Sequence, residues 1–369
     1  MDIKLYDRNL TTPAPPDDLT DKVQNLKFST KLHGGFYLCT FNLKADLPEA
    51  WEWFTGKAFC RLVISDATRT LWEGRIEDIG LSEGAVTVTA YGYYANLSDI
   101  PYNTAYNDNF DVVLKAVLTA CCTQISADQS NIDATGGPAI TSGADSEYLD
   151  IYPKEIVEKL AKFSDDTYSG KWFFAVWEDR VPYLKRRVTT AIDWQTAPCD
   201  FARFKLVHRG AELWNSCYAV YDAGGVVTRT ATTNDTDSQT KYGSSAASFT
   251  RRKVIPQLGS VAAATAQAAR DHWLEEYHEI WGRMEDMVLG PNVQDANGVP
   301  YPSSRVRAGD VLRVRDLVPA SADLDAIARD ALRTFYIVET SYDAERGELR
   351  ITPDLESASL DAILAKKVK

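Results

Sequence analysis

Apolar and polar residues alternate through most of the first hundred residues of the chain. The alternation runs through five short segments that are separated by Gly and Asp: VQNLKFSTKL, GGFYLCTFNLKA, AFCRLVISD, LWEGRIEDIGL and AVTVTAYGY. A period of two in segments rich in β-branched and aromatic residues predicts antiparallel strands. Five such strands joined by short turns indicate a small barrel or sandwich, so residues 1–100 are predicted to form a first β-domain.

The period changes near residue 101. Apolar residues in FDVVLKAVLTACCTQI recur at three and four positions, which predicts an amphipathic helix. YPKEIVEKLAKFSDDT is predicted to be a second helix, with Pro153 in its first turn, where proline is tolerated. WFFAVWEDRVPYLKRR indicates two strands joined by a Glu-Asp turn. Together these segments predict an α+β domain over residues 101–200.

Alternation returns after residue 200. LWNSCYAVYDAGGVVTRTATT is predicted to be a hairpin, and RVRAGDVLRVRDLVP, TFYIVETSY and GELRITPD contain the last strands. Between them a polar tract predicts a loop, and residues 261–289 contain the longest predicted helix, which ends near Gly282. We assign residues 201–235 and 283–355 to a second β-domain, residues 236–282 to an insertion with the long helix, and residues 356–369 to a C-terminal helix and tail. The fold class is mixed α+β and mainly β.

One hairpin pattern occurs twice. Residues 71–99, LWEGRIEDIGLSEGAVTVTAYGYYANLSD, resemble residues 335–354, FYIVETSYDAERGELRITPD. Placing Phe335 on Trp72 also places Gly347 on Gly84 and Ile351 on Val88. A strand that ends in an acidic residue precedes each hairpin, CRLVISD in one case and VLRVRD in the other. The pattern fits two copies of one β-fold, or only the likeness that any two hairpins share.

Charge and cysteine content narrow the functional classes. The chain of 369 residues has a formal net charge of −12, whereas a general nucleic-acid binder needs a basic face. A local patch at Lys185, Arg186 and Arg187 remains open. The six cysteines are scattered without a CxxC pair, and the chain shows neither a signal pattern nor an apolar run long enough to span a membrane. We expect free thiols and assembly in a reducing cytoplasm.

Motifs for catalysis and for phosphate binding are absent from the sequence. GxxxxGK[ST], GxGxxG, HExxH and GxSxG do not occur. His272 and Glu276 share a helix face, which fits a metal site or an exposed acidic stripe, and the stripe is the simpler interpretation. Trp51 and Trp53 would face the same way on a strand, as a sugar-stacking platform or as part of a core or subunit interface. We predict no catalytic residue, no cofactor and no metal.

Three segments, in order, resemble the hub proteins of bacteriophage tails, at the baseplate or the tail tip. LWEGRIEDIGLSEGAVTVTAYGYYANLSD is similar to the signature of the family's first barrel. LWNSCYAVYDAGGVVTRTATTNDTDSQTKYG is similar to the middle segment, and RVRAGDVLRVRDLVP with TFYIVETSYDAERGELRITPD is similar to the closing one. The resemblance covers most of the chain. It implies that both β-domains are tube-type β-barrels.

The resemblance also implies an assembly. Three chains would form a ring of six near-equivalent barrels that continues the tail tube and lets the tape-measure protein and then DNA pass. The implied partners are the distal tail protein ring or tube proteins and a tail fibre, spike or tip protein. The implied location is the tip of the virion tail. The candidate residues for the channel wall or an interface are Trp72, Glu73, Arg75, Glu77, Asp78, Phe335 and Glu339.

Two other functional classes remain open. A host-surface glycan-binding module would need only the Trp surfaces, and a carbohydrate-active enzyme would need paired carboxylates in an aromatic cleft. Many tail-tip hubs continue into a peptidase, lysozyme or fibre-binding region, whereas this chain stops fifteen residues after Asp354. We therefore expect the chain not to be an enzyme.

Overall fold

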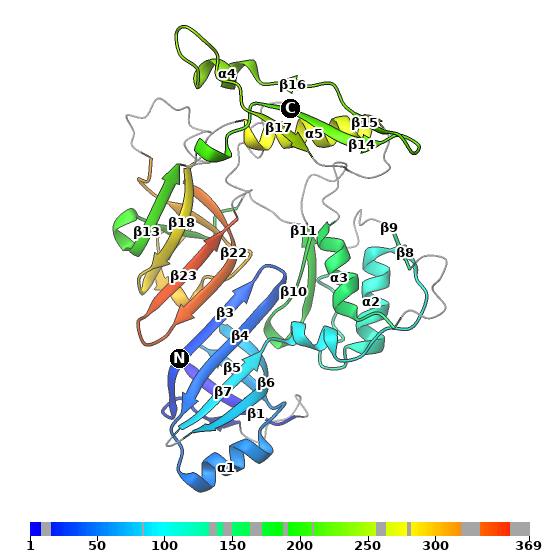
Figure 1. Cartoon of the computed structure of the whole chain (residues 1–369). Coiled ribbons are helices and arrows are strands. Elements are labelled where there is room, and N and C mark those ends of the chain that lie inside the picture. Colours follow the sequence, from blue (N-terminus) through cyan, green and yellow to red (C-terminus); the bar gives the residue numbers. More distant parts are fainter. Residues whose placement is uncertain are drawn as a thin grey trace. The chain divides into compact units, whose positions relative to one another are not determined.

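β-Strands dominate the computed structural model, and helices are inserted between groups of strands (Figure 1). The structure describes residues 1–8, 16–82, 85–132, 139–142, 150–162, 172–186, 191–208, 210–255, 263–278, 282–318 and 333–354. The chain forms two compact units. Unit 1 comprises Met1–Arg203, Met287–Arg315 and Tyr336–Pro353, and unit 2 comprises Phe204–Asp286, Asp316–Phe335 and Asp354–Lys369. The predicted fold class, mixed α+β and mainly β, is confirmed.

The N-terminal strands of unit 1 form one antiparallel sheet in the order β2-β1-β5-β6-β7-β4-β3. Their bounds are β1 (Asp2–Tyr6), β2 (Asp17–Asp18), β3 (Val23–Lys31), β4 (Gly34–Leu43), β5 (Arg61–Ser65), β6 (Thr70–Ser82) and β7 (Ala85–Tyr91). The five alternating segments thus form strands, as predicted. In β7 the alternation places Val86, Val88 and Ala90 in the core, because successive side chains of a strand point to opposite faces.

Helix α1 (Leu47–Gly56) corrects one prediction. The segment PEAWEW is helical, and the carboxylate of Asp46 accepts a hydrogen bond from the Glu49 backbone N–H at 2.9 Å, which caps the first turn. Residues two positions apart in a helix are separated by about 200° around its axis, so the two tryptophans point to different sides. Trp53 is buried and Trp51 is exposed. They cannot form the shared platform that a strand would have given.

The insertion in unit 1 packs two helices on a hairpin. Its elements are a 3₁₀-helix η1 (Tyr93–Ser98), β8 (Asn107–Asn109), α2 (Phe110–Cys121), β9 (Ala139–Thr141), α3 (Pro153–Lys162), β10 (Trp172–Val176) and β11 (Pro182–Arg186). Phe110, Leu114, Ile156 and Phe174 lie together in its core. Strand β10 runs parallel to the start of β4, where Gly35, with a φ of +82°, leaves room for the Val176 backbone. Both predicted helices and the hairpin are confirmed.

A second group of strands follows. The bounds are β12 (Trp194–Thr196), β13 (Phe201–His208), β18 (Gly282–Leu289), β19 (Asn292–Asp295), β20 (Pro300–Pro302), β21 (Val311–Val314), β22 (Thr334–Asp343) and β23 (Glu348–Pro353). β22 pairs with β23, and β23 pairs with β18, both antiparallel. β12 pairs parallel with β21 and antiparallel with β19. β22 also pairs with β3, so these strands and the N-terminal ones belong to one 17-stranded sheet.

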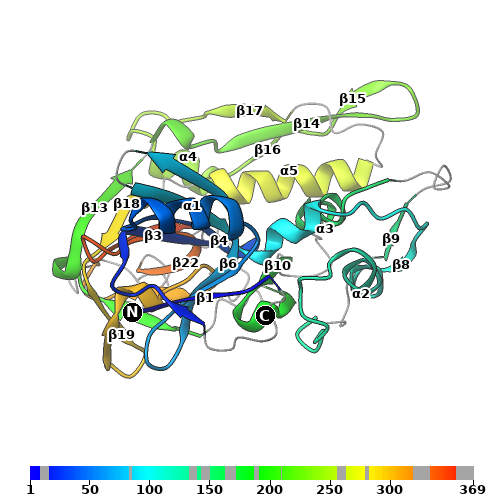
Figure 2. The same cartoon turned by 90° about the horizontal axis from the view of Figure 1, so that it is seen from below.

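Unit 2 contains a separate four-stranded sheet. Strand β14 (Ser216–Asp222) pairs with β15 (Val227–Arg229), β16 (Thr233–Asn234) and β17 (Arg252–Ile255). Helix α5 (Ala263–Tyr277) covers one face through Leu274, and α4 (Thr236–Lys241) lies in the tract predicted to be a loop (Figure 2). Of the described residues in segment 201–235, only those of β13 belong to the 17-stranded sheet. The predicted C-terminal helix lies outside the described residues.

No helix in the described part of the chain has the length and apolar character needed to cross a lipid bilayer.

Candidate assembly interface

The two hairpins of the repeated pattern match pair for pair. Hairpin β6–β7 pairs Ile76–Ala90, Asp78–Thr89, Ile79–Val88, Gly80–Thr87 and Leu81–Val86. Hairpin β22–β23 pairs Ile337–Pro353, Glu339–Thr352, Thr340–Ile351, Ser341–Arg350 and Tyr342–Leu349. Both ladders shift register at the same place, directly after Ile76 and directly after Ile337. A bulge at an equivalent position in two ladders indicates that the hairpins are copies of one structure.

The two hairpins align with a two-residue shift in their first strands that the sequence comparison did not show. Val88 corresponds to Ile351, as predicted, but Phe335 corresponds in register to Gly74 rather than to Trp72. The second turn is two residues longer than the first, since Asp343–Glu348 closes it where Ser82–Ala85 closes the other. A slip of two keeps a residue on the same face of a strand, which is why the alternation concealed it. Gly84 lies outside the described residues.

The likeness extends to the strands on both sides of the hairpins. Strand β18 pairs with β23 as β4 pairs with β7, with Met287 in the place of Phe41. The backbone of Ile76 bonds to the Phe59 N–H and the Cys60 carbonyl, and the backbone of Ile337 bonds to the Gly309 N–H and the Asp310 carbonyl.

Phe59 and Gly309 both have positive φ, at +65° and +96°. We name β4, β5, β6 and β7 the N-terminal repeat, and β18, β21, β22 and β23 the C-terminal repeat.

Strand β3 joins the two repeats at what we name the junction. It pairs antiparallel with β22 from Glu339–Lys31 to Asp343–Lys27, and these two terminal pairs bring opposite charges to 3.6 and 3.2 Å. Between them the hydroxyl oxygens of Thr30 and Thr340 lie 2.6 Å apart in a buried position. The rings of Phe28 and Tyr342 are 5.2 Å apart. The junction is a strand-to-strand interface with a buried centre and a charged rim.

A second link within unit 1 joins the end of β5 to residues before β21. The Nε of Arg305 donates to the Asp66 carboxylate at 2.6 Å, and its Nη2 donates to the Thr68 hydroxyl at 2.6 Å. Burial raises the pKa of Asp66, but the hydrogen bond and charge of Arg305 outweigh it and hold the pKa below its ordinary value. Asp66 is the acidic residue that the sequence places at the end of the strand before the first hairpin.

Four of the seven candidate residues are buried in the chain itself, namely Trp72, Glu73, Arg75 and Phe335. Trp72 and Phe335 are core side chains. Glu73 is also buried, where it forms an ion pair with Arg61 at 3.0 Å and accepts a hydrogen bond from the Asp179 backbone N–H at 2.9 Å. Burial raises the pKa of Glu73, and the charge of Arg61 opposes that rise. A side chain that the fold already covers has no surface to present to a channel.

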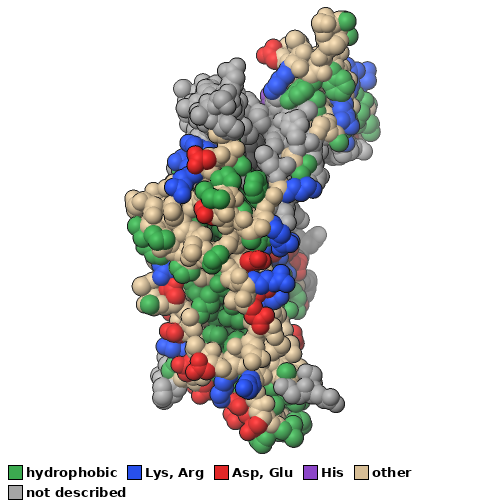
Figure 3. Space-filling model, turned by 90° about the vertical axis from the view of Figure 1, so that its left-hand side faces the viewer, with side chains coloured by type: hydrophobic (Ala, Val, Ile, Leu, Met, Phe, Trp, Pro, Cys, Tyr) green, Lys and Arg blue, Asp and Glu red, His purple; other side chains and the backbone are tan. Residues whose placement is uncertain are grey.

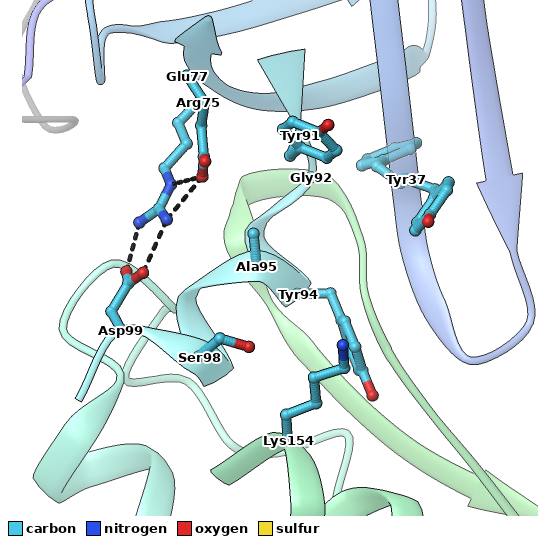
Figure 4. A pocket seen from close by; sticks show the side chains of 11 residues that line it. Tyr37, Arg75, Glu77, Tyr91, Gly92, Tyr94, Ala95, Ser98, Asp99 and Lys154 are labelled. Carbon is cyan, nitrogen blue, oxygen red and sulfur yellow. Dashed lines mark hydrogen bonds and ion pairs between the residues drawn. The ribbon is translucent and has the colours of Figure 1, made fainter. Parts of the chain in front are cut away.

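Arg75 and Glu77 meet at a pocket in unit 1 with a volume of about 320 Å³. The Arg75 guanidinium lies between the carboxylates of Glu77 and Asp99, and its Nη2 donates to Asp99 at 2.9 Å. Lys154 of α3 lies on the other side of the pocket (Figure 4). Burial raises the pKa of Asp99, yet the hydrogen bonds from Arg75 and Asn96 hold it below its ordinary value. These contacts connect the N-terminal repeat to its insertion.

The other candidates lie at strand edges. Asp78 is exposed on β6, and Glu339 lies in the junction. The structure therefore does not gather the seven candidates into one site. Sequence reasoning missed β3 as the partner of β22, although Lys27 and Lys31 have the same spacing as Glu339 and Asp343 and offered a signal. The structure does not describe the side chains of His272 and Glu276.

The comparisons with known proteins bear on this fold. No family model and no curated protein sequence matches the chain. A 43 kDa tail protein of prophage MuSo2 from Shewanella oneidensis superimposes with a TM-score of 0.59 at 10% identity, over 97% of this chain and 100% of that one. A tail protein from Neisseria meningitidis MC58 gives 0.56 at 12% identity, over 97% and 98%. Prophage tail protein gp18 from Listeria monocytogenes EGD-e gives 0.53 at 13%, over 100% and 98%.

The chain has the fold of phage tail proteins. This likeness bears out the sequence resemblance at the level of the fold, because it includes nearly the whole chain in each case. The tail-protein fold therefore comprises both repeats together with the helical segments between them. At these identities the likeness says nothing about individual side chains.

Proposed function

We propose that this chain is a structural component of a bacteriophage tail, namely the trimeric hub at the tail tip or baseplate. The observation that carries the proposal is that one chain builds the same four-strand repeat twice and joins the copies edge to edge through β3 and β22. Two repeats per chain let three chains present six near-equivalent β-barrels. A ring of that kind can stack on a sixfold tube while it offers threefold symmetry to the tip.

The proposed ring has an opening for the tape-measure protein and then for DNA. The chain has a net charge of −12, and Glu77 and Asp78 of β6 keep some surface in the monomer. Negative wall residues would repel the DNA backbone and let it slide past. Purified protein should show no tight binding to duplex DNA at low salt by fluorescence anisotropy, and tight binding would count against this passage.

The proposal requires surfaces for other tail proteins. On the face that Figure 3 shows, apolar side chains gather between charged ones. On helix α1 the rings of Trp51 and Phe54 are both exposed, 5.7 Å apart. Trp and Phe are enriched at protein interfaces relative to the rest of a protein surface. Under the proposal they face the next ring of the tail or a fibre, and the role needs no catalysis.

The exposed Trp51–Phe54 pair also fits the second candidate function, binding of a host-surface glycan by ring stacking. Glycan-array binding that a Trp51→Ala variant loses would favour this alternative. If the wild-type protein binds no glycan on the array, the Trp51–Phe54 pair is better explained as a contact for a protein partner.

The proposal is tested by the mass and images of the purified full-length protein. Light scattering or native mass spectrometry should give three copies, and electron micrographs should show a ring with six lobes. A protein that stays monomeric, also in the presence of its tail-tube partner, would argue for a different role.

A further inference from the structure

We propose that the edge of β6 at residues 78–82 binds strand β13 of a second copy of this chain and so repeats the junction between chains. The inference rests on the proposed ring, and it names the surface through which that ring closes. It comes from the internal repeat, because one copy of the repeat has a strand on this edge and the other copy does not.

The open edge is on β6. Strand β5 pairs with β6 only as far as Arg75, and on that side the described part of the chain has no strand paired with Asp78–Ser82. The equivalent residues of β22, Glu339–Asp343, are paired with β3 over their whole length. An unpaired strand edge offers backbone N–H and C=O groups to another strand.

The side chains on the two edges differ accordingly. Leu81 is 37% exposed, whereas its counterpart Tyr342, which packs on Phe28 of β3, is 7% exposed. The same position is thus apolar in both repeats and buried only where a strand covers it. A partner strand on β6 would bury Leu81 in the same way.

Strand β13 is the counterpart of β3. The Lys44 N–H, directly after β4, donates to the Lys22 carbonyl at 2.9 Å, and the Gly290 N–H, directly after β18, donates to the Asp200 carbonyl at 3.0 Å. Lys22 and Asp200 directly precede β3 and β13, so VQNLKFSTK aligns with FARFKLVH. Leu26 is 5% exposed beside β22, and its counterpart Phe204 is 42% exposed. Both halves of the inferred interface therefore expose apolar residues whose counterparts the junction buries.

This pairing produces a closed assembly. Each chain offers the β6 edge of its N-terminal repeat and strand β13, which begins beside β18 of its C-terminal repeat, so the contact is heterologous and can continue around a ring. Inside a chain β3 joins the N-terminal repeat to the C-terminal one. Between chains β13 would join the C-terminal repeat to the N-terminal repeat of the next copy. All contacts around the ring are then of one kind. The backbone position of residue 206 in β13 is the one opposite Leu81, as the position of Phe28 in β3 is opposite Tyr342.

Disulfide trapping tests the pairing directly. A Leu81→Cys, Leu206→Cys double variant in a Cys199→Ser background removes the exposed native thiol and leaves native cysteines that are buried. Residues opposite one another in antiparallel strands have Cβ atoms about 5 Å apart, close enough for a disulfide. Mild oxidation of the full-length protein should convert at least half of it into covalently linked trimers, and neither single variant should give more than a linked dimer.

The outcomes separate the two proposals. If light scattering shows trimers but this pair does not crosslink between chains, the β6–β13 pairing is overturned and the proposed hub stands. If neither trimers nor crosslinks form with the tube partner present, both the proposed hub function and the proposed β6–β13 pairing are contradicted.

A charge substitution gives an independent test. Leu81→Asp should raise the concentration needed for half-assembly at least tenfold, because it places a carboxylate in the inferred interface. Leu47→Asp, the same change at a more exposed position on α1, is the matched control and should assemble as the wild type does. Equal assembly of both variants, with unchanged circular dichroism, would exclude β6 as the interface.

Discussion

The hairpins of the N-terminal and C-terminal repeats have matching registers, and the two repeats differ in the strand that covers them. The C-terminal repeat has β3 on the edge of β22, with Phe28 against Tyr342, while the equivalent edge of β6 has no such strand in the described structure. The interiors differ as well, because Glu73 and Arg61 correspond to Thr334 and Val311. The same backbone arrangement therefore accommodates different interior side chains, and the edges of β6 and β22 determine which strand each repeat binds.

The largest effect is expected from removing the centre of the junction. Phe28→Ala should lower the free energy of unfolding by about 4 kcal/mol, because it deletes a buried ring that packs on Tyr342. Phe54→Ala makes the same change at an exposed ring of α1 and should cost less than about 1 kcal/mol. Urea unfolding followed by fluorescence measures both. Equal losses in the two variants would show that the junction contributes little to stability.

The buried ion pair of the N-terminal repeat comes next. Arg61→Met should destabilise the protein by about 3 kcal/mol, because it leaves Glu73 buried without its partner. The double variant Arg61→Val, Glu73→Thr copies the C-terminal repeat and should recover most of that loss. Its recovery would show that the repeats are exchangeable in this position. If the double variant is as unstable as the single one, the two interiors are not equivalent.

Asp66 gives a smaller effect that depends on pH. Its pKa is held below the ordinary value, so the stabilisation is present above about pH 4 and is lost as the pH falls through the lowered pKa. Asp66→Asn keeps the acceptor oxygen for Thr68 and Arg69 but removes the charge next to Arg305. The variant should be less stable by about 1 kcal/mol at pH 7. Unfolding curves at a series of pH values should show this difference disappear in acid, and a constant difference would mean that the Asp66 charge is irrelevant.

The smallest effects concern the shared turn with positive φ. Gly309→Ala should cost about 1 kcal/mol, because a side chain at a φ of +96° is strained. Phe59→Gly should change stability by less than about 0.5 kcal/mol, because relief of strain is offset by the greater freedom of glycine in the unfolded chain. Thermal unfolding compares the two. A large loss in Phe59→Gly would indicate that the Phe59 ring supports the turn.

The sequence predicted the strands and the recurrence well, because both depend on local alternation. It placed Val88 on Ile351 but missed the two-residue slip at Trp72, since a shift of two leaves the buried face unchanged. It missed α1, although Asp46, Pro48 and Glu49 are typical of a helix start. The pairing of β3 with β22 links residues about 310 positions apart and could not follow from local pattern. The burial of Glu73 likewise depends on Arg61 and Asp179 from other elements.

Electron cryomicroscopy of the assembled full-length protein would show whether both repeats of each chain build one ring. We expect a ring of three chains in which six copies of the four-strand repeat alternate, with N-terminal and C-terminal repeats side by side. A ring of six chains, or an assembly in which only one of the two repeats lines the opening, would contradict it.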